Sequence, residues 1–222
     1  MPLKYGIKNN PILTDLQKRV LLALSQEGYI AENFYLTGGT ALSAFYFGHR
    51  YSEDLDFFTH QASLQDMNKT LDIIFEKMGM RYKSLQSAPY IHRYLVEPDL
   101  KLDFVLDTPQ RIGSPILSEH ILIDNLSNIA TNKVCTILGR LDAKDYVDLY
   151  FILENSDLQL EKLFEWAKLK DGGMDLFMWA SLLREVQTFQ VLPRMIYPLS
   201  LKKLKTYYLQ LRDQLLLSLK PK

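Results

Sequence analysis

The pattern of apolar residues changes near Ser114 and Pro115, and this change constrains the fold more than any other feature of the sequence. Before it, short runs typical of β-strands alternate with amphipathic segments. After it, from about Asp124 onward, apolar residues recur almost everywhere at helical spacing. We therefore predict an α+β fold, with a mixed sheet and helices over residues 1–118 and an all-helical C-terminal domain over residues 119–222.

The spacing of apolar and turn-forming residues also predicts individual elements. Helices are expected over residues 12–26, 40–47 and 63–78, with Gly28 ending the first, and strands over 34–37, 55–59, 90–96 and 101–106. The last two strands should form a hairpin, because Pro98 and Asp99 between them favour a turn. Further helices are expected at about 125–138, 143–154, 159–170, 175–190 and 199–218.

The composition excludes several classes of protein. A chain of 222 residues buries enough surface to fold without stabilising disulfide bonds or structural metals. Its lone Cys135 excludes a disulfide framework and a cysteine-based zinc site. Because 26 basic residues balance 26 acidic ones, a protein that coats nucleic acid through bulk charge is disfavoured, although a local basic surface is not. The sequence shows neither an apolar run of about 20 residues nor a signal-peptide pattern, so we expect no membrane association and a cytoplasmic location.

Asp54 and Asp56 point most directly to chemistry. They lie two positions apart in an expected strand, so their side chains share one face, while Leu55 and Phe57 face a core. Two adjacent carboxylates repel, and a protein keeps such a pair where a cation neutralises it. Oxygen ligands suit Mg²⁺, which binds one or two carboxylates together with substrate phosphates. Taken alone, this pattern is also typical of a solvated strand face or loop.

A glycine pair precedes these carboxylates. Gly38, Gly39 and Thr40 lie between an expected strand and an expected helix. Glycines let a ligand approach the backbone, and a helix N-terminus offers free N–H groups to phosphate. Such a tripeptide by itself is most often an ordinary turn. Its proximity to the aspartates favours a nucleotide site, with a phosphate cradle beside metal ligands.

Asp103 is a third carboxylate of interest. It alternates with Leu102 and Phe104, so it is expected on the polar side of its strand. If this strand lies beside residues 55–59, Asp103 joins the aspartate pair, and three carboxylates are the set that two-metal phosphoryl transfer uses. The alternative is a polar outer position on an edge strand.

Lys133 falls within or at the edge of the apolar stripe of the helix at 125–138. Lysine is almost never buried unless it is paired. Its amine is therefore expected either to reach water along the helix surface or to bind a carboxylate or a nucleotide triphosphate, and we favour the second. In the next helix Asp148 lies among apolar residues, where a buried acid needs a partner, and Arg140 or Lys133 would serve.

Taken in order, these motifs resemble the AbiEii/AbiGii toxin family of nucleotidyltransferases. The matching residues are Gly-Gly-Thr-Ala-Leu at 38–42, Arg-Tyr-Ser-Glu-Asp-Leu-Asp-Phe at 50–57, Asp103, Lys133 with Arg140, and Lys-Asp-Tyr-Val-Asp-Leu at 144–149. The likeness spans about residues 36–153. It implies a DNA-polymerase-β-like nucleotidyltransferase core with a helical C-terminal part, and a toxin of a type IV toxin–antitoxin or abortive-infection system.

The resemblance also implies three groups of site residues. Those that would hold the nucleotide are Gly38, Gly39, Thr40, Ser52 and Lys133. Those that would ligate metal, at an expected two-metal Mg²⁺ site, are Asp54, Asp56 and Asp103. The last catalytic motif would comprise Lys144 and Asp145, where the family often has arginine in place of this lysine.

The implied substrates are an NTP and an acceptor. Some family members transfer nucleotides to the acceptor end of tRNA, so the 3′ end of tRNA is the acceptor we expect, with a winged-helix antitoxin as protein partner. Transfer to a protein hydroxyl or to a small molecule such as an aminoglycoside is an alternative, because the acceptor pocket has no motif. A second alternative is a non-catalytic binding module of the same fold, against which the intact aspartates argue.

The C-terminal helix is the expected RNA surface. After Ser200 there are six basic residues and one acid, and three of the basic residues, Lys202, Lys205 and Arg212, should point away from the apolar face. The others are Lys203, Lys220 and Lys222. This local excess favours contact with a phosphate backbone, and a solvated terminal helix is the alternative.

Overall fold

The computed structural model describes residues 1–219, which divide into two compact units. The first comprises residues 1–108 and 114–125, and the second comprises residues 109–113 and 126 onward. The structure thus divides the chain later than residue 118, because a strand at 121–123 still pairs within the sheet. Lys220 and Lys222 lie outside the described residues.

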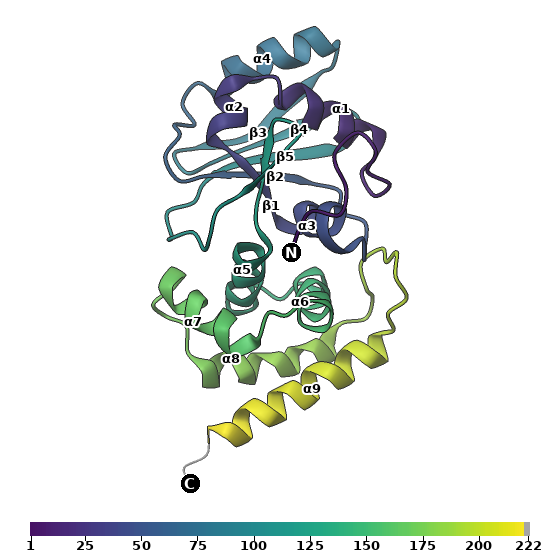
Figure 1. The fold of residues 1–222 in the computed structure, drawn as a ribbon, viewed down its shortest axis with the longest axis vertical. Helices are drawn as coiled ribbons and strands as arrows, with labels where there is room; N and C mark the ends of the chain where they lie inside the picture. The colour runs from purple at the N-terminus through teal and green to yellow at the C-terminus, as the bar shows by residue number, and fades with distance from the viewer. Residues whose placement is uncertain (220–222) are drawn as a thin grey trace. The chain divides into compact units, whose positions relative to one another are not determined.

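The first unit contains the strands of the sheet and four short to medium helices (Figure 1). The strands are β1 (Tyr35–Thr37), β2 (Leu55–Thr59), β3 (Tyr82–Ala88), β4 (Ile91–Val96), β5 (Leu100–Leu106), β6 (Ile116–Ser118) and β7 (Ile121–Ile123). The helices are α1 (Asp15–Leu24), α2 (Gly28–Asn33), α3 (Gly38–Leu42), continued by the π-helical turn η1 (Ser43–Phe47), and α4 (Met67–Met78). Gly28 begins α2, so it does not merely end the first helix.

Within the described residues the strands form one seven-stranded mixed sheet in the order β3-β4-β5-β2-β1-β7-β6. The predicted hairpin is confirmed as β4 and β5, which pair antiparallel, and β2 pairs parallel with β5. The pattern of the sequence missed β3, β6 and β7. Most side chains of β3 are exposed, so it shows no alternation, and the other two strands have three residues each, too few for a period to show.

One face of the sheet is apolar and carries the core of the first unit. Phe57 of β2 stacks on Phe104 of β5 with ring centroids 5.4 Å apart, and Phe34 meets Phe104 edge-on at 5.3 Å. Tyr94 of β4 is fully buried beside them. Burying each such ring contributes about 1.5–3 kcal/mol. Because side chains alternate along a strand, this packing sends the neighbouring residues of β2 and β5 to the opposite face.

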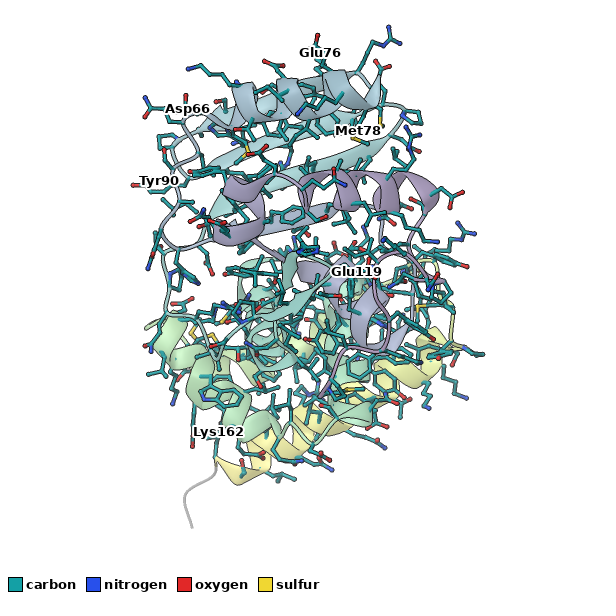
Figure 2. The ribbon with its side chains drawn as sticks, turned by 45° about the horizontal axis from the view of Figure 1, so that its top comes forward. Asp66, Glu76, Met78, Tyr90, Glu119 and Lys162 are labelled. Atoms are coloured by element: carbon teal, nitrogen blue, oxygen red, sulfur yellow. The ribbon has the colours of Figure 1, made fainter. Side chains whose placement is uncertain are left out.

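Two polar contacts fix the ends of elements in this unit. Glu119, labelled in Figure 2, lies in the β6–β7 turn, and its carboxylate accepts hydrogen bonds from the backbone N–H groups of Ile7 (3.1 Å) and Lys8 (3.3 Å). Thr14 caps α1 in a reciprocal capping box with Gln17. The N-terminal segment is thereby held to the unit.

The elements of the second unit are helices, as predicted. It contains α5 (Leu126–Gly139), α6 (Ala143–Asn155), α7 (Leu160–Lys170), α8 (Leu176–Leu182), the 3₁₀ helix η2 (Leu183–Thr188) and α9 (Leu201–Ser218). Its core contains Trp179, whose indole N–H donates to the Val134 carbonyl at 2.9 Å, and Tyr208, whose hydroxyl donates to the Tyr146 carbonyl at 2.6 Å. Among the described helices, none combines the length and the apolar character needed to cross a membrane.

Candidate active site

A row of polar side chains crosses the sheet on the face opposite the aromatic core. The register pairs Asp56 of β2 with Asp103 of β5, and it extends to Thr37 of β1 on one side and Arg93 of β4 on the other. Because β5 lies beside β2, the condition under which Asp103 would join the aspartate pair is met. Asp54 lies in the segment just before β2.

The glycine turn between β1 and α3 lies against this row. Gly38 has φ +70°, a conformation that side chains rarely adopt, and a Cβ built on it would lie 2.5 Å from Asp56 Oδ2. The Thr40 hydroxyl donates a hydrogen bond to the Asp54 carbonyl. The glycine turn therefore contacts both aspartates of the predicted pair, Asp56 through Gly38 and Asp54 through Thr40.

Arg50 brings a positive charge to the same turn. Arg50 is 2% exposed, and a Cβ at Gly39 would clash with Arg50 Nη2 and lie 3.1 Å from Ser52 Oγ. The Ser43 hydroxyl donates to the Arg50 carbonyl, which fixes the backbone here. Arg50 belongs to the motif that contains Asp54, yet the sequence offered no reason to assign it a role, since its burial comes only from the fold.

Arg93 is a second charged residue that sequence reasoning missed. Its Nε donates to both carboxylate oxygens of Asp103 (2.9 and 3.0 Å), and its Nη2 donates to Oδ2 (2.7 Å). These bonds are the main cause that raises the pKa of Arg93; burial opposes the shift, and the charges of Asp103, Asp56 and Asp54 reinforce it. Only the cross-strand register brings Arg93 to this row, so no local motif could have indicated it.

The carboxylates of the row are possible ligands for a divalent metal. Among the described residues, no group of three or more His, Cys, Asp or Glu side chains is arranged to hold a metal ion. Asp103 is bound by Arg93 instead. Asp54 and Asp56 provide hard oxygen donors beside the glycine turn, and a cation would relieve the repulsion between these carboxylates and a phosphate. These residues fit Mg²⁺ held by carboxylates together with substrate phosphates.

Asp124 extends the polar row beyond β1, and the sequence gave no sign of it. It is fully buried at the end of β7, and its Oδ2 accepts a hydrogen bond from the Thr37 hydroxyl at 2.7 Å. Its backbone is held as well, because its N–H donates to the Leu36 carbonyl (2.8 Å) and its carbonyl accepts from the Tyr46 hydroxyl (2.7 Å). Asp124 therefore anchors the strand that leads into the glycine turn.

Lys133 of α5 is buried in the second unit and binds two carboxylates of α6. Its Nζ lies 2.8 Å from Asp145 Oδ1 and 2.7 Å from Asp148 Oδ2, and both aspartate side chains are fully buried. Of the alternatives for this lysine, contact with a carboxylate is the one observed, and extension to water is not. The predicted need of Asp148 for a basic partner is confirmed.

Arg140 is exposed and binds the same buried carboxylate from the surface. Its Nε lies 2.7 Å from Asp145 Oδ2, and its Nη2 lies 3.1 Å from Asp145 Oδ1. Burial alone would raise the pKa of Asp145, but the charge of Lys133 and the bonds from Arg140 and Lys133 hold it below the usual value. Burial alone would likewise lower the pKa of Lys133, but the charges of Asp148 and Asp145 raise it. Lys133 and Asp145 are therefore both charged at neutral pH.

The predicted site residues are thus divided between the two units. The first unit holds Gly38, Gly39, Thr40, Ser52, Asp54, Asp56 and Asp103. The second holds Lys133, Lys144 and Asp145. Lys144 is exposed in the first turn of α6, and its backbone N–H donates to the N-cap residue Asp142 at 2.9 Å.

The basic residues of α9 differ in their exposure and in the groups that their side chains contact. Lys202 is exposed, as predicted. Lys205 is half-buried and donates from Nζ to the Gln187 carbonyl at 2.9 Å, while Arg212 lies 2.7 Å from the Asp213 carboxylate. Lys203 Nζ lies 5.7 Å from the centroid of the Tyr150 ring. The outward face is therefore less uniformly basic than the sequence suggested.

This chain is similar in sequence to known proteins. The family described as nucleotidyl transferase AbiEii toxin, Type IV TA system, matches residues 19–174. An uncharacterized protein of Aquifex aeolicus strain VF5 is 30% identical over 152 residues, which cover 66% of this chain and 70% of that protein.

Two solved structures from Helicobacter pylori share the fold. A candidate nucleotidyltransferase superposes with a TM-score of 0.58 at 17% identity, covering 94% of this chain and all of that one. The protein JHP933 gives a TM-score of 0.54 at 20% identity, covering 93% and 96% of the two chains. The predicted family, fold class and enzyme class are confirmed. Because the family match includes the carboxylate row, the glycine turn and the buried lysine network, this chain belongs to the AbiEii family of nucleotidyltransferase toxins of type IV toxin–antitoxin systems.

Proposed function

We propose that this nucleotidyltransferase transfers a nucleoside monophosphate from an NTP to the 3′ end of tRNA, with Mg²⁺ held by Asp54 and Asp56. The observation that carries this proposal is the close approach of the Gly38 backbone to the Asp56 carboxylate. A turn that presents its backbone to a phosphate beside a carboxylate that repels phosphate favours a cation between the two. An NTP complexed with Mg²⁺ meets both requirements.

Each predicted site residue of the first unit has a role in this proposal. Gly38, Gly39, Thr40 and Ser52 hold the triphosphate, and buried Arg50 adds positive charge beside them. The metal, when bound, neutralises phosphate charge and orients the α-phosphate. The Asp103 carboxylate accepts the proton of the acceptor hydroxyl, whose oxygen then attacks the α-phosphorus while pyrophosphate leaves.

The second unit contributes through the first turn of α6. The bonds from buried Lys133 and exposed Arg140 to Asp145 fix this turn, and exposed Lys144 presents its amine from it. In this proposal Lys144 contacts phosphate, and Asp145 positions the turn. The amine of Lys133 already binds two carboxylates. A direct contact between Lys133 and phosphate therefore stays a prediction.

The partners follow from the same proposal. The family implies an antitoxin that restrains the enzyme, and we propose that this antitoxin carries a winged helix. The substrates NTP and tRNA place the reaction in the cytoplasm. Transfer to a protein hydroxyl or to an aminoglycoside is the competing function, since the motifs describe only the nucleotide half of the reaction.

The experiment that tests the function presents all acceptors under one condition. The protein is incubated with each labelled NTP and Mg²⁺, together with tRNA, cell protein or an aminoglycoside, and Asp54→Ala serves as the blank. We expect label on tRNA with the wild type alone. Label found only on protein or aminoglycoside would assign the competing acceptor, and no metal-dependent transfer to any acceptor would indicate a binding module.

The helix α9 offers a test of the RNA surface. Replacing Lys202, Lys205 and Arg212 with Gln should weaken tRNA binding and flatten its salt dependence, because each lost contact to a single strand removes about 0.7 from the log–log slope. NTP binding should stay unchanged. Since Lys202 is exposed while Lys205 and Arg212 are half-buried, the single change Lys202→Gln should account for a large share of the effect.

A variant with the same loss of charge on another surface controls for bulk electrostatics. Lys69, Lys77 and Lys83 are exposed on α4 and β3, and their replacement by Gln should leave tRNA affinity near wild type. If both triple variants bind tRNA alike over a salt titration, α9 is not the RNA surface.

A further inference from the structure

The row of polar side chains that crosses the sheet, here called the carboxylate row, contains a counter-ion for its own aspartates. Arg93 makes three hydrogen bonds to Asp103, and these engage both carboxylate oxygens. Such fork-shaped pairs are short, directional and roughly twice as strong as neutral hydrogen bonds. Arginine stays charged at every pH at which the protein is folded, so this neutralisation is permanent as long as the pair persists.

The same pair opposes a metal ion. A divalent ion ligated by Asp103 would have to displace the guanidinium from one oxygen or lie close to its positive charge. The charges of Asp54 and Asp56 also act on Arg93, so the arginine lowers the negative potential of the whole row. Arg93 has room to leave, since its side chain is 41% exposed while that of Asp103 is 13% exposed.

We propose that Arg93 competes with the divalent metal for Asp103, so that the row binds metal weakly alone and fills when nucleotide phosphates supply further ligands. This rests on the proposed function, because it takes Asp54 and Asp56 as the primary ligands. It assigns to Arg93 a positioning role: its hydrogen bonds hold the Asp103 carboxylate in one orientation before the substrate arrives. It also predicts that metal and NTP bind with positive coupling.

Mn²⁺ binding, followed by electron paramagnetic resonance of the free ion, tests the proposal without catalysis. Without nucleotide, Arg93→Gln should bind Mn²⁺ about tenfold more tightly than the wild type or better, since a nearby positive charge is removed. Asp103→Asn alone should change little, but in the Arg93→Gln background it should reverse the gain. A nucleotide analogue that cannot be cleaved should tighten Mn²⁺ binding more in the wild type than in Arg93→Gln.

Arg81→Gln is the matched control. Arg81 lies 2.8 Å from Glu97 in an exposed ion pair of the same unit, and its loss should leave Mn²⁺ affinity unchanged. Arg93→Lys keeps the charge without the fork and should give a smaller gain; it carries the test if thermal melts show that Arg93→Gln is unfolded. Wild-type Mn²⁺ affinity in the folded Arg93 variants would overturn the proposal.

The outcomes separate this inference from the proposed function. If Mn²⁺ fails to bind the wild type even with the analogue, or if Asp56→Asn binds it as the wild type does, the metal assignment itself is wrong. If those two results come out as expected and the Arg93 variants still match the wild type, only the competition by Arg93 is wrong.

Discussion

Asp56→Asn is expected to abolish nucleotidyl transfer while leaving the fold intact. The change keeps the shape of the side chain but removes the charge that faces the glycine turn. A bound metal supplies several kcal/mol of charge stabilisation, which corresponds to a loss of ~10³-fold or more in rate. Stability should change little, because the relieved repulsion with neighbouring carboxylates offsets the lost attraction to Arg93. Label transfer and a thermal melt measure the two effects.

Glu53→Gln is the matched control for this prediction. Glu53 is an exposed acid three residues before Asp56, and removing its charge should leave transfer near wild type. Thermal stabilisation by NTP with Mg²⁺ gives a readout that needs no acceptor: at a hundred times Kd it amounts to about 2.7 kcal/mol. The wild type and Glu53→Gln should show it. If Asp56→Asn transfers nucleotide at the wild-type rate, Asp56 is not a metal ligand.

Lys133→Ala should cost about 3–5 kcal/mol of unfolding free energy, because it breaks a buried ion pair. The change removes the ammonium group that lies 2.7 Å from Asp148 Oδ2, and it leaves Arg140 as the basic side chain bound to Asp145. Urea denaturation measures this. Lys162, labelled in Figure 2, forms an exposed ion pair on α7 with Glu165, and Lys162→Ala should cost less than about 1 kcal/mol. Equal urea midpoints for the two variants would show that the buried network contributes no stability.

The same network predicts how stability depends on pH. Asp145 has a folded pKa below its usual 3.8, so its contribution is present above that value and is lost as the pH falls through the folded pKa. Lys133 has a folded pKa above its usual 10.5, so its contribution is present below that value and is lost as the pH rises through the folded pKa. Lys133→Ala should therefore differ most from the wild type between these limits.

Much of the fold was predictable because its signals are local. The helices of the second unit were all expected, since each buries an apolar stripe that repeats at helical spacing. The β4–β5 hairpin was expected from its turn residues. In contrast, β3 is an exposed edge strand, and β6 and β7 are short, so their position in the sheet depends on pairing with distant strands.

The candidate site divides in the same way. The sequence by itself determined the glycine turn, the aspartates of β2 and β5 and the buried lysine of α5, because each is a short motif whose strand or helix period shows where the side chain points. Only the tertiary structure decided which charges meet. Arg93 reaches Asp103 through strand register, Arg50 is buried beside Gly39, and Asp124 joins the row through β7. Such contacts join residues far apart in the chain, and no local pattern encodes a distance between them.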